Sequence, residues 1–408
     1  MRCLKDRSLG KDYVMAVRSM RDAGLHDETV LVRVDFNVPL DGETIRDDTR
    51  IRAALPTIQY LLDRDNAIIL VSHLGRPKGK VDPKYSLQPI AKHLATLIEE
   101  PVIMAADVVG PDSQAKAKVL KAGEILLLEN VRFEAGEEAN DPALAKKLAS
   151  LAEVFVNDAF GAAHRAHAST VGVASDLPAY AGDLMLAEIK ALQRIVTAPR
   201  TGFVAIIGGA KVSDKIDVLT NLVPKVETLI IGGGMANTFL LAAGREVGTS
   251  LVERDATSLA DEIVQAASSA GTKILLPTDA VVAPSIDAEA GAVVGVENIA
   301  TDQAIFDIGP SSIATFCASI SAATTIFWNG PMGVFERQPF AAGTEAIAQA
   351  VADADAFSLV GGGDSVAAVT AAGLEDRISH ISTGGGASLE YVEGRELPGI
   401  VALEQAPS

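Results

Sequence analysis

Short apolar runs alternate with longer helical patterns along the first half of the chain. The helical patterns include residues 50–62 and 87–98. The apolar runs cover residues 29–34, 67–71, 102–104, 125–128 and 154–156. Most of these runs end directly in charged or amide residues. Strands that alternate with helices, without hairpin turns between them, indicate βαβ units and a mostly parallel sheet. The pattern therefore predicts an α/β fold.

The same rhythm returns in the second half, but glycine ends most of the runs. The apolar runs there cover residues 205–207, 228–231, 274–276, 326–328, 357–360 and 381–382. Four of them meet glycine clusters, at residues 208–209, 232–234, 361–363 and 384–386. Parallel strands bind ligands beyond their carboxyl ends. The first half therefore predicts a small, densely charged ligand, and the second half a larger one that carries phosphates and a flat base.

Residues 183–196 form one amphipathic helical pattern between the two series. Met185, Ile189 and Leu192 fall at helical spacing, and Pro199 ends the pattern. We expect this helix to connect two domains. A chain of 408 residues supports that division, since two domains of roughly 180–200 residues are the natural expectation at this length.

Composition and charge narrow the class of protein. Charged residues make up 22% of the chain, aromatic residues 4%, and the net charge is −18. This charge argues against a general nucleic-acid or membrane-surface binder. Cys3 and Cys317 show no metal-ligand spacing, and no signal peptide or membrane-spanning run is visible. We therefore expect a cytoplasmic protein.

The stretch 203–219 predicts a phosphate site. A buried strand runs into Gly208 and Gly209, and Lys211 and Lys215 follow at the start of a helix. Cations at a helix N-terminus are unfavourable unless an anion lies among them. Free backbone N–H groups, two ammonium groups and a helix N-terminus together suit a phosphate. The alternative is a solvated helix start with two surface lysines.

Basic side chains gather at the strand ends of the first half. The candidates are Arg33, Arg50, His73, Arg76, Arg132, His164, Arg165 and His167. Each of them alone would be read as a surface ion pair, but together they suit a carboxylate or phosphate, which arginine binds with two parallel hydrogen bonds. Asp35 and Asn37 are available for hydroxyl groups. A zinc site at His164 and His167 is disfavoured, because a third ligand is missing.

The second half lacks the common nucleotide motifs. It contains no GxxxxGK[ST] sequence and no GxGxxG that opens a Rossmann unit. A nicotinamide-dependent dehydrogenase is therefore weakly supported. Glu336 and Asp364 follow strands, where one could bind the ribose and the other a metal that accompanies a nucleoside triphosphate.

The motifs of the chain, taken in order, resemble those of phosphoglycerate kinase. They are VRVDFNVPL, SHLGRP, LENVRF, NDAFGAAHRAHAST, GGAKVSDKI, GGGMANTF, WNGPMGVFE, GGGDS and STGGGASLE, and they extend from about residue 30 to residue 389. The resemblance implies two Rossmann-like domains with mostly parallel sheets, joined by an interdomain helix. It implies an N-terminal domain at 1–182, a hinge at 183–198, a nucleotide domain at 199–388 and a tail at 389–408 that returns to the first domain.

The resemblance also implies the site residues. Those for 3-phosphoglycerate or 1,3-bisphosphoglycerate are Asp35, Asn37, Arg50, His73, Leu74, Gly75, Arg76, Arg132, His164, Arg165 and His167. Those for Mg-ATP or Mg-ADP are Lys211, Lys215, Asn329, Glu336, Gly362, Gly363, Asp364 and Ser365, with Glu336 on the ribose and Asp364 on the magnesium. A monomer is the family expectation, with no nucleic-acid or membrane partner.

The implied reaction passes the acyl phosphate of 1,3-bisphosphoglycerate to ADP. In the reverse direction the nucleophile is a carboxylate that is already ionised, so positioning and charge stabilisation suffice. We assign these catalytic roles to Arg50 and Lys215, assisted by Lys211, and expect closure on the 183–196 helix. A catalytically silent nucleotide-binding protein is the alternative, which retention of these residues disfavours.

Departures from the family pattern lie away from the expected phosphoryl-transfer residues. Residues 1–14 form an extension, or the chain starts at Met15. Asp183 and Leu186 change the packing of the hinge, and Ile305 stands near a position where relatives often have glycine.

Overall fold

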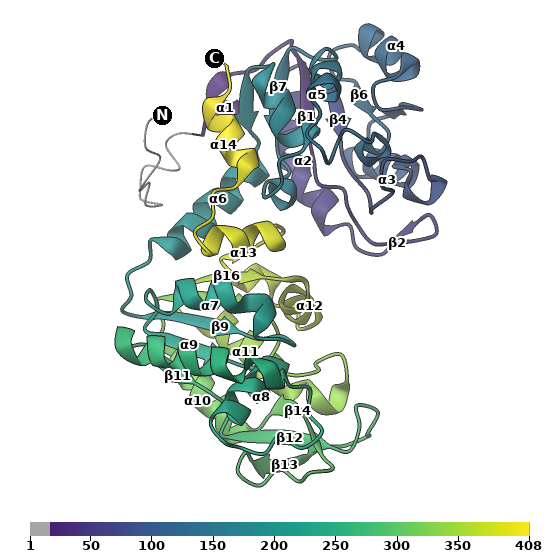
Figure 1. The fold of residues 1–408 in the computed structure, drawn as a ribbon. Helices are drawn as coiled ribbons and strands as arrows, with labels where there is room; N and C mark the ends of the chain where they lie inside the picture. The colour runs from purple at the N-terminus through teal and green to yellow at the C-terminus, as the bar shows by residue number, and fades with distance from the viewer. Residues whose placement is uncertain (1–16, 408) are drawn as a thin grey trace. The chain divides into compact units, whose positions relative to one another are not determined.

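The computed structural model describes residues 17–407, which fold around two separate parallel sheets (Figure 1). The N-terminal sheet has six strands, all paired in parallel. In spatial order they are β5 (Val102–Met104), β6 (Ile125–Leu127), β4 (Ala67–Val71), β1 (Thr29–Arg33), β7 (Val154–Asn157) and β8 (Ala179–Ala181). The strands β4 and β5 have the predicted bounds.

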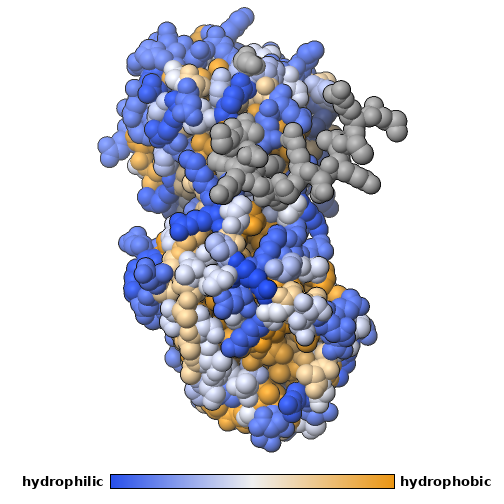
Figure 2. Space-filling model, turned by 90° about the vertical axis from the view of Figure 1, so that its left-hand side faces the viewer, coloured by the Kyte–Doolittle hydropathy of each residue, from blue (hydrophilic) through white to orange (hydrophobic). Residues whose placement is uncertain are grey.

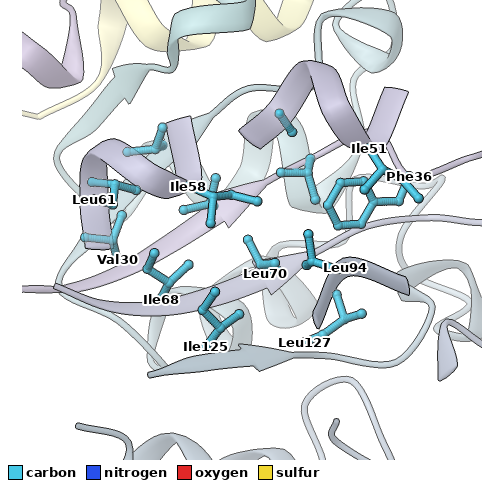
Figure 3. Close-up of a cluster of buried hydrophobic side chains, with 14 of the residues drawn as sticks. Val30, Phe36, Ile51, Ile58, Leu61, Ile68, Leu70, Leu94, Ile125 and Leu127 are labelled. Atoms are coloured by element: carbon cyan, nitrogen blue, oxygen red, sulfur yellow. The ribbon is translucent and has the colours of Figure 1, made fainter. Parts of the chain in front are cut away.

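Burial on both faces explains why these strands are continuous apolar runs. Val30 pairs with Ile68 on one side and with Val154 on the other, and none of the five residues of β4 is exposed. Side chains of β1, β4 and β6 pack against those of helices α2 (Thr49–Leu62) and α3 (Gln88–Ile98), as Figure 3 shows. This layer holds the carboxyl ends of β1 and β4 in fixed positions.

The C-terminal sheet repeats the architecture. Its strands, all parallel, are β11 (Lys273–Leu275), β10 (Thr228–Ile231), β9 (Phe203–Ile207), β15 (Thr325–Asn329), β16 (Phe357–Gly361) and β17 (His380–Ile381). Together the two sheets confirm the predicted α/β class with two parallel-sheet domains.

Two antiparallel elements correct the expectation that hairpin turns are missing. Strands β2 (Leu40–Asp41) and β3 (Thr44–Ile45) form a small hairpin. Strand β12 (Asp279–Ala283) pairs antiparallel with β13 (Ala292–Gly295) and β14 (Ala304–Ile308). No strands were predicted between residues 276 and 326. Strand β12 is mostly buried and contains an apolar run that was missed, whereas β13 has no buried residue and β14 is interrupted by Asp307.

The described residues divide into two compact units. The N-terminal unit contains the residues up to Lys190 and those from Glu396 onward, and the C-terminal unit contains Ala191–Arg395. The division falls inside helix α6 (Asp183–Val196), whose bounds match the predicted helix. The limits of these units differ from those of the predicted N-terminal domain (1–182), hinge (183–198), nucleotide domain (199–388) and tail (389–408). The assignment of these domains stays a prediction. The proposed extension at 1–14 and Cys3 lie outside the described residues.

Helices cover both sheets. Those of the N-terminal unit, besides α2 and α3, are α1 (Met20–Ala23), α4 (Pro111–Val119), α5 (Pro142–Ala149) and α14 (Pro398–Gln405). Those of the C-terminal unit are α7 (Ile216–Leu222), α8 (Gly233–Ala242), α9 (Thr257–Ala270), α10 (Pro310–Ser321), α11 (Ala342–Asp353), α12 (Gly363–Ala371) and α13 (Gly386–Val392).

Hydrophilic side chains dominate the visible face of the N-terminal unit, and the C-terminal unit mixes hydrophilic and hydrophobic residues (Figure 2). Among residues 17–407, none of the helices combines the length and the apolar character that crossing a bilayer requires.

Candidate active site

In the N-terminal unit, the carboxyl end of β1 and the start of α2 bring a carboxylate and an arginine together. Asp35 follows β1 and is buried, and Arg50 lies in the first turn of α2. The Arg50 Nη1 donates to Asp35 Oδ2 at 3.0 Å and to the Asn37 carbonyl at 3.3 Å. About a third of the Arg50 side chain remains exposed, 32% against 8% for Asp35, so the guanidinium is still accessible to a ligand.

The loop after β4 joins this cluster through its backbone. Gly75 donates its N–H to Asn37 Oδ1 at 2.9 Å and accepts from Arg132 Nη1 at 2.7 Å. Its φ of +59° is one that glycine adopts without strain. Leu74 is buried, and Asn130 holds both its N–H (3.2 Å) and its carbonyl (2.7 Å). The structure thus brings Asn37, Gly75 and Arg132 together.

His73 is buried and neutral at this site. Burial, followed by the charges of Arg33, Arg132 and Arg50, lowers the pKa of His73 well below its ordinary value. The Arg33 Nη2 lies 3.0 Å from His73 Nδ1. Since a guanidinium only donates, Nδ1 is the acceptor and the ring proton is on Nε2. His73 therefore contributes a hydrogen-bond donor and no charge.

Arg33 and Glu137 form a buried network behind the cluster. Arg33 Nε donates to Ser169 Oγ at 2.8 Å, and the Ser169 hydroxyl donates to Glu137 Oε1 at 2.6 Å. Glu137 also lies 3.6 Å from His167 Nδ1. Arg33 has 1% of its surface exposed, so it supports His73 and is not accessible to a ligand. In the sequence Arg33 stands out only by its charge, and Glu137 was not among the predicted site residues.

The remaining predicted residues of this unit lie in different surroundings. His167 is buried beside Glu137, while Arg165 is exposed and its Nε lies 3.0 Å from His164 Nε2. Burial lowers the pKa of the Arg132 guanidinium, Glu138 opposes this shift, and the charges of Arg33 and Arg165 add to it. Arg76 is exposed. The cluster as a whole presents guanidinium and amide groups that suit a phosphorylated acid.

In the C-terminal unit, a cavity of about 360 Å³ lies beside the glycine-ended strands. Its apolar wall includes Leu240, Leu251, Ile286, Ile305 and Val334. Its polar edge includes Glu336 and Asp364. Most of the wall residues carry no local sequence signal, because they come from segments far apart in the chain. An apolar chamber with a few polar groups at its edge is typical of a small-molecule site.

Close backbone packing explains two of the glycines. A Cβ on Gly208 would lie 2.0 Å from the Pro331 carbonyl oxygen. A Cβ on Gly233, whose φ is +67°, would lie 2.7 Å from the Gly209 carbonyl oxygen. Only glycine lets the ends of β9 and β10 approach the 330–332 turn so closely.

Lys215 ends a 3₁₀ turn (η6, Ser213–Lys215) that leads into α7. Its Nζ donates to Asn329 O at 2.9 Å and to Asn329 Oδ1 at 2.5 Å. Burial lowers the pKa of Lys215 to about 8, against the opposing charges of Asp364 and Asp214. Asn329 Nδ2 is buried and has no hydrogen-bond partner among the described residues. Lys211 is exposed.

The backbone at this lysine turn differs from the expectation of free N–H groups. Glu253 accepts the N–H of Ser213 at 3.1 Å and its hydroxyl at 2.5 Å, and it also accepts the N–H of Val212. The anion at this helix start is therefore a side chain of the protein itself. The sequence offered no signal for this contact, since 40 residues separate the partners.

The glycine turn before α12 places the other predicted residues. Gly362 has a φ of +87°, and Gly363 and Asp364 are exposed in the first turn of the helix. Ser365 is buried and accepts the N–H of Gly330 at 2.6 Å, so it holds the 330 turn. The exposed carboxylate of Asp364 at the edge of the cavity is a hard oxygen ligand of the kind that Mg²⁺ prefers.

The N-terminal unit carries an arginine cluster, and the C-terminal unit carries a lysine turn, a carboxylate and a largely apolar cavity. Together these features define a nucleotide-dependent phosphotransferase. The family model described as phosphoglycerate kinase matches residues 20–395. The chain therefore belongs to the phosphoglycerate kinase family, phosphotransferases whose acceptor is a carboxyl group.

Individual relatives agree over nearly their whole length. The phosphoglycerate kinase of Moorella thermoacetica is 56% identical over 392 residues, which cover 96% of this chain and 100% of the relative. The phosphoglycerate kinase of Herpetosiphon aurantiacus is 54% identical over 391 residues, which cover 95% of this chain and 99% of the relative.

Solved structures of the family share the fold. Phosphoglycerate kinase from Coxiella burnetii superimposes with a TM-score of 0.87 at 42% identity, covering 95% of this chain and 99% of its own. Phosphoglycerate kinase from Pyrococcus horikoshii superimposes with a TM-score of 0.82 at 34% sequence identity, covering 95% of this chain and 98% of its own.

Proposed function

We propose that this chain transfers the acyl phosphate of 1,3-bisphosphoglycerate reversibly to ADP, giving 3-phosphoglycerate and ATP. The observation that carries the proposal is the ammonium of Lys215, which Asn329 holds beside a cavity edged by Asp364. A silent nucleotide-binding protein would gain nothing from keeping a buried lysine whose charge is costly.

The arginine cluster is proposed to hold the phosphorylated acid. Arg50, about a third of whose side chain is exposed, would bind its carboxyl or phosphate oxygens, and Arg132, which donates to the Gly75 carbonyl, would assist. Asp35 and Asn37 would accept from or donate to its hydroxyl group. The other members of this proposed set are His73, Leu74, Gly75, Arg76, His164, Arg165 and His167.

The cavity and its edge are proposed to hold the nucleotide. Its apolar wall suits a flat base, and Glu336 at the edge would accept from the ribose hydroxyls. The phosphates would reach Lys211, Lys215, Asn329, Gly362, Gly363 and Ser365. Asp364 would hold Mg²⁺ together with the phosphate oxygens, because one carboxylate plus substrate oxygens is a usual magnesium environment. When bound, the ion supplies positive charge that offsets the charge of the phosphates.

The residues of this chain would act by position and charge. The carboxylate of 3-phosphoglycerate is ionised at neutral pH, so the reaction requires no general base. Arg50 and Lys215, assisted by Lys211, would stabilise the negative charge that spreads over the transferred phosphoryl group. Closure on α6 would bring the two substrates in line and exclude water. A cytoplasmic, monomeric enzyme remains the expectation from the family resemblance.

A coupled assay tests this proposal. The protein is given 3-phosphoglycerate and Mg-ATP, and glyceraldehyde-3-phosphate dehydrogenase reports the product by loss of NADH absorbance. Turnover is expected, and Arg50→Ala should lower kcat by about a hundredfold or more. Arg52→Ala is the matched control. Arg52 lies on the same helix as Arg50 and pairs with Asp48 just before it, so this variant should leave kcat unchanged. No turnover, with ADP still binding by calorimetry, would establish the silent binding protein instead.

A further inference from the structure

Residues 249–253, which we call the strap, connect three parts of the nucleotide site. The Thr249 N–H donates to the Gln303 carbonyl at 2.9 Å, and Ser250 Oγ accepts the Ile305 N–H at 2.8 Å. Both contacts tie the strap to β14. Further along, the Leu251 carbonyl accepts from Asn237 Nδ2 at 3.0 Å, and the Glu253 N–H donates to Thr238 Oγ1 at 3.1 Å. These two contacts tie the strap to α8.

The middle of the strap forms part of the cavity wall. Leu251 lines the cavity together with Ile305, and 58% of its surface is exposed. A leucine this exposed is a favourable surface for an apolar, flat group to cover. Burying it under a nucleotide base would hold the strap against α8 and β14.

The end of the strap holds the lysine turn. The Glu253 carboxylate accepts two backbone N–H groups and one hydroxyl at Val212 and Ser213. These donors stand at the start of the short turn that carries Lys215 and directly after Lys211. Partial burial favours a higher pKa for Glu253, but these hydrogen bonds and the charge of Lys211 lower it, so the group is ionised. Charge-assisted hydrogen bonds of this kind are about twice as strong as neutral ones.

We propose that Glu253 is a positioning residue for phosphoryl transfer, and that the strap couples occupancy of the base pocket to the lysine turn. The proposal rests on the proposed function of the site. Its physical basis is the shortness of the turn, since three residues of 3₁₀ helix satisfy few of their own N–H groups. Without Glu253 these donors return to water, and the backbone that carries Lys211 and Lys215 loses an anchor, while Asn329 still holds the Lys215 ammonium. A base that covers Leu251 steadies the strap and, through Glu253, the turn.

Binding and kinetics of Glu253→Ala and Glu253→Gln test the positioning role. Glu253→Ala should weaken ADP binding and lower kcat, each by about tenfold, because three hydrogen bonds to a charged group are lost. Adenosine, which lacks phosphates, should bind within about twofold of its original affinity, and the KM for 3-phosphoglycerate should not change. Glu253→Gln keeps an acceptor oxygen, so its ADP affinity and kcat should lie between those of the original protein and those of Glu253→Ala. Glu262→Ala, an exposed acid of α9, is the control.

The coupling is tested with Leu251→Ala in both backgrounds. In the otherwise unchanged protein, Leu251→Ala should lower kcat for ATP. In Glu253→Ala it should lower kcat no further, since the connection to the turn is already broken. Additive losses would remove the coupling from the proposal.

Three results would overturn the positioning role. Tighter ADP binding by Glu253→Ala would make Glu253 a repelling charge, and unchanged ADP binding and kcat would make it a surface acid. Equal losses for ADP, adenosine and 3-phosphoglycerate would indicate general damage. The proposed function fails separately, if the unsubstituted protein itself shows no turnover.

Discussion

Lys215→Met should abolish most of the activity while it stabilises the C-terminal unit. Methionine has a similar reach but no charge. The ammonium is the group that we assign to the developing charge of the phosphoryl group, and such donors contribute about 3–4 kcal/mol, or about 10²–10³ in kcat. The loss should be in kcat more than in the KM for ATP.

The gain in stability follows from the burial of the ammonium. The pKa of Lys215 falls from 10.5 to about 8, chiefly because burial penalises the charged form. That difference corresponds to a cost of about 3 kcal/mol, an upper limit because part of the side chain is exposed. Since the folded pKa lies below the unfolded one, the cost is complete below pH 8 and disappears as the pH rises to about 10.5.

A lost hydrogen bond offsets part of this gain. Asn329 Oδ1 loses its donor, which costs about 1–2 kcal/mol. The Asn329 carbonyl remains paired, because it also accepts the Gly208 N–H at 3.0 Å. We therefore expect a net stabilisation of about 1–2 kcal/mol at pH 7, shrinking towards pH 10.

Urea unfolding followed by tryptophan fluorescence measures this effect. Trp328 is the single tryptophan of the chain, lies in β15 and is fully buried, so it reports on the C-terminal unit. Lys225→Met is the control, since burial lowers the pKa of Lys225 too but it does not line the cavity, and its kcat should not change. The reasoning is refuted if Lys215→Met is less stable than the original protein at pH 7, or if it keeps its kcat.

Two further substitutions test the packing around the sites. Burial raises the pKa of Asp158 to about 7, so its contribution to stability is full below about pH 4 and is lost as the pH rises through 7. Asp158→Asn should flatten the decline of melting temperature between about pH 4 and pH 7, and an unchanged slope would exclude Asp158 as the source of that decline. Gly333→Ala places a Cβ 2.4 Å from Asp307 Oδ1 and 2.6 Å from the Phe306 carbonyl oxygen, beside the cavity. It should cost about 1–3 kcal/mol of stability and raise the KM for ATP but not for 3-phosphoglycerate; equal changes in both KM values would contradict a local effect.

The order of strands and helices could be predicted because it depends on local patterns. A buried parallel strand must be apolar on both faces, so 67–71 and 228–231 were visible as runs and correspond to β4 and β10. The helix at 183–196 was equally visible, since one face of it is apolar at regular spacing. The family motifs then pointed to the residues that follow these strands.

Contacts between distant segments were decided only by the tertiary structure. The lysine turn was predicted to offer free N–H groups, but the Glu253 carboxylate, 40 residues further along the chain, accepts from them. Arg33 was listed as a basic candidate for the substrate, but it is buried against Ser169, 136 residues further on. The cavity wall likewise joins Leu251, Ile305 and Val334 from separate elements. A local pattern records which face of an element is buried, but which side chain meets it there depends on how the whole chain packs.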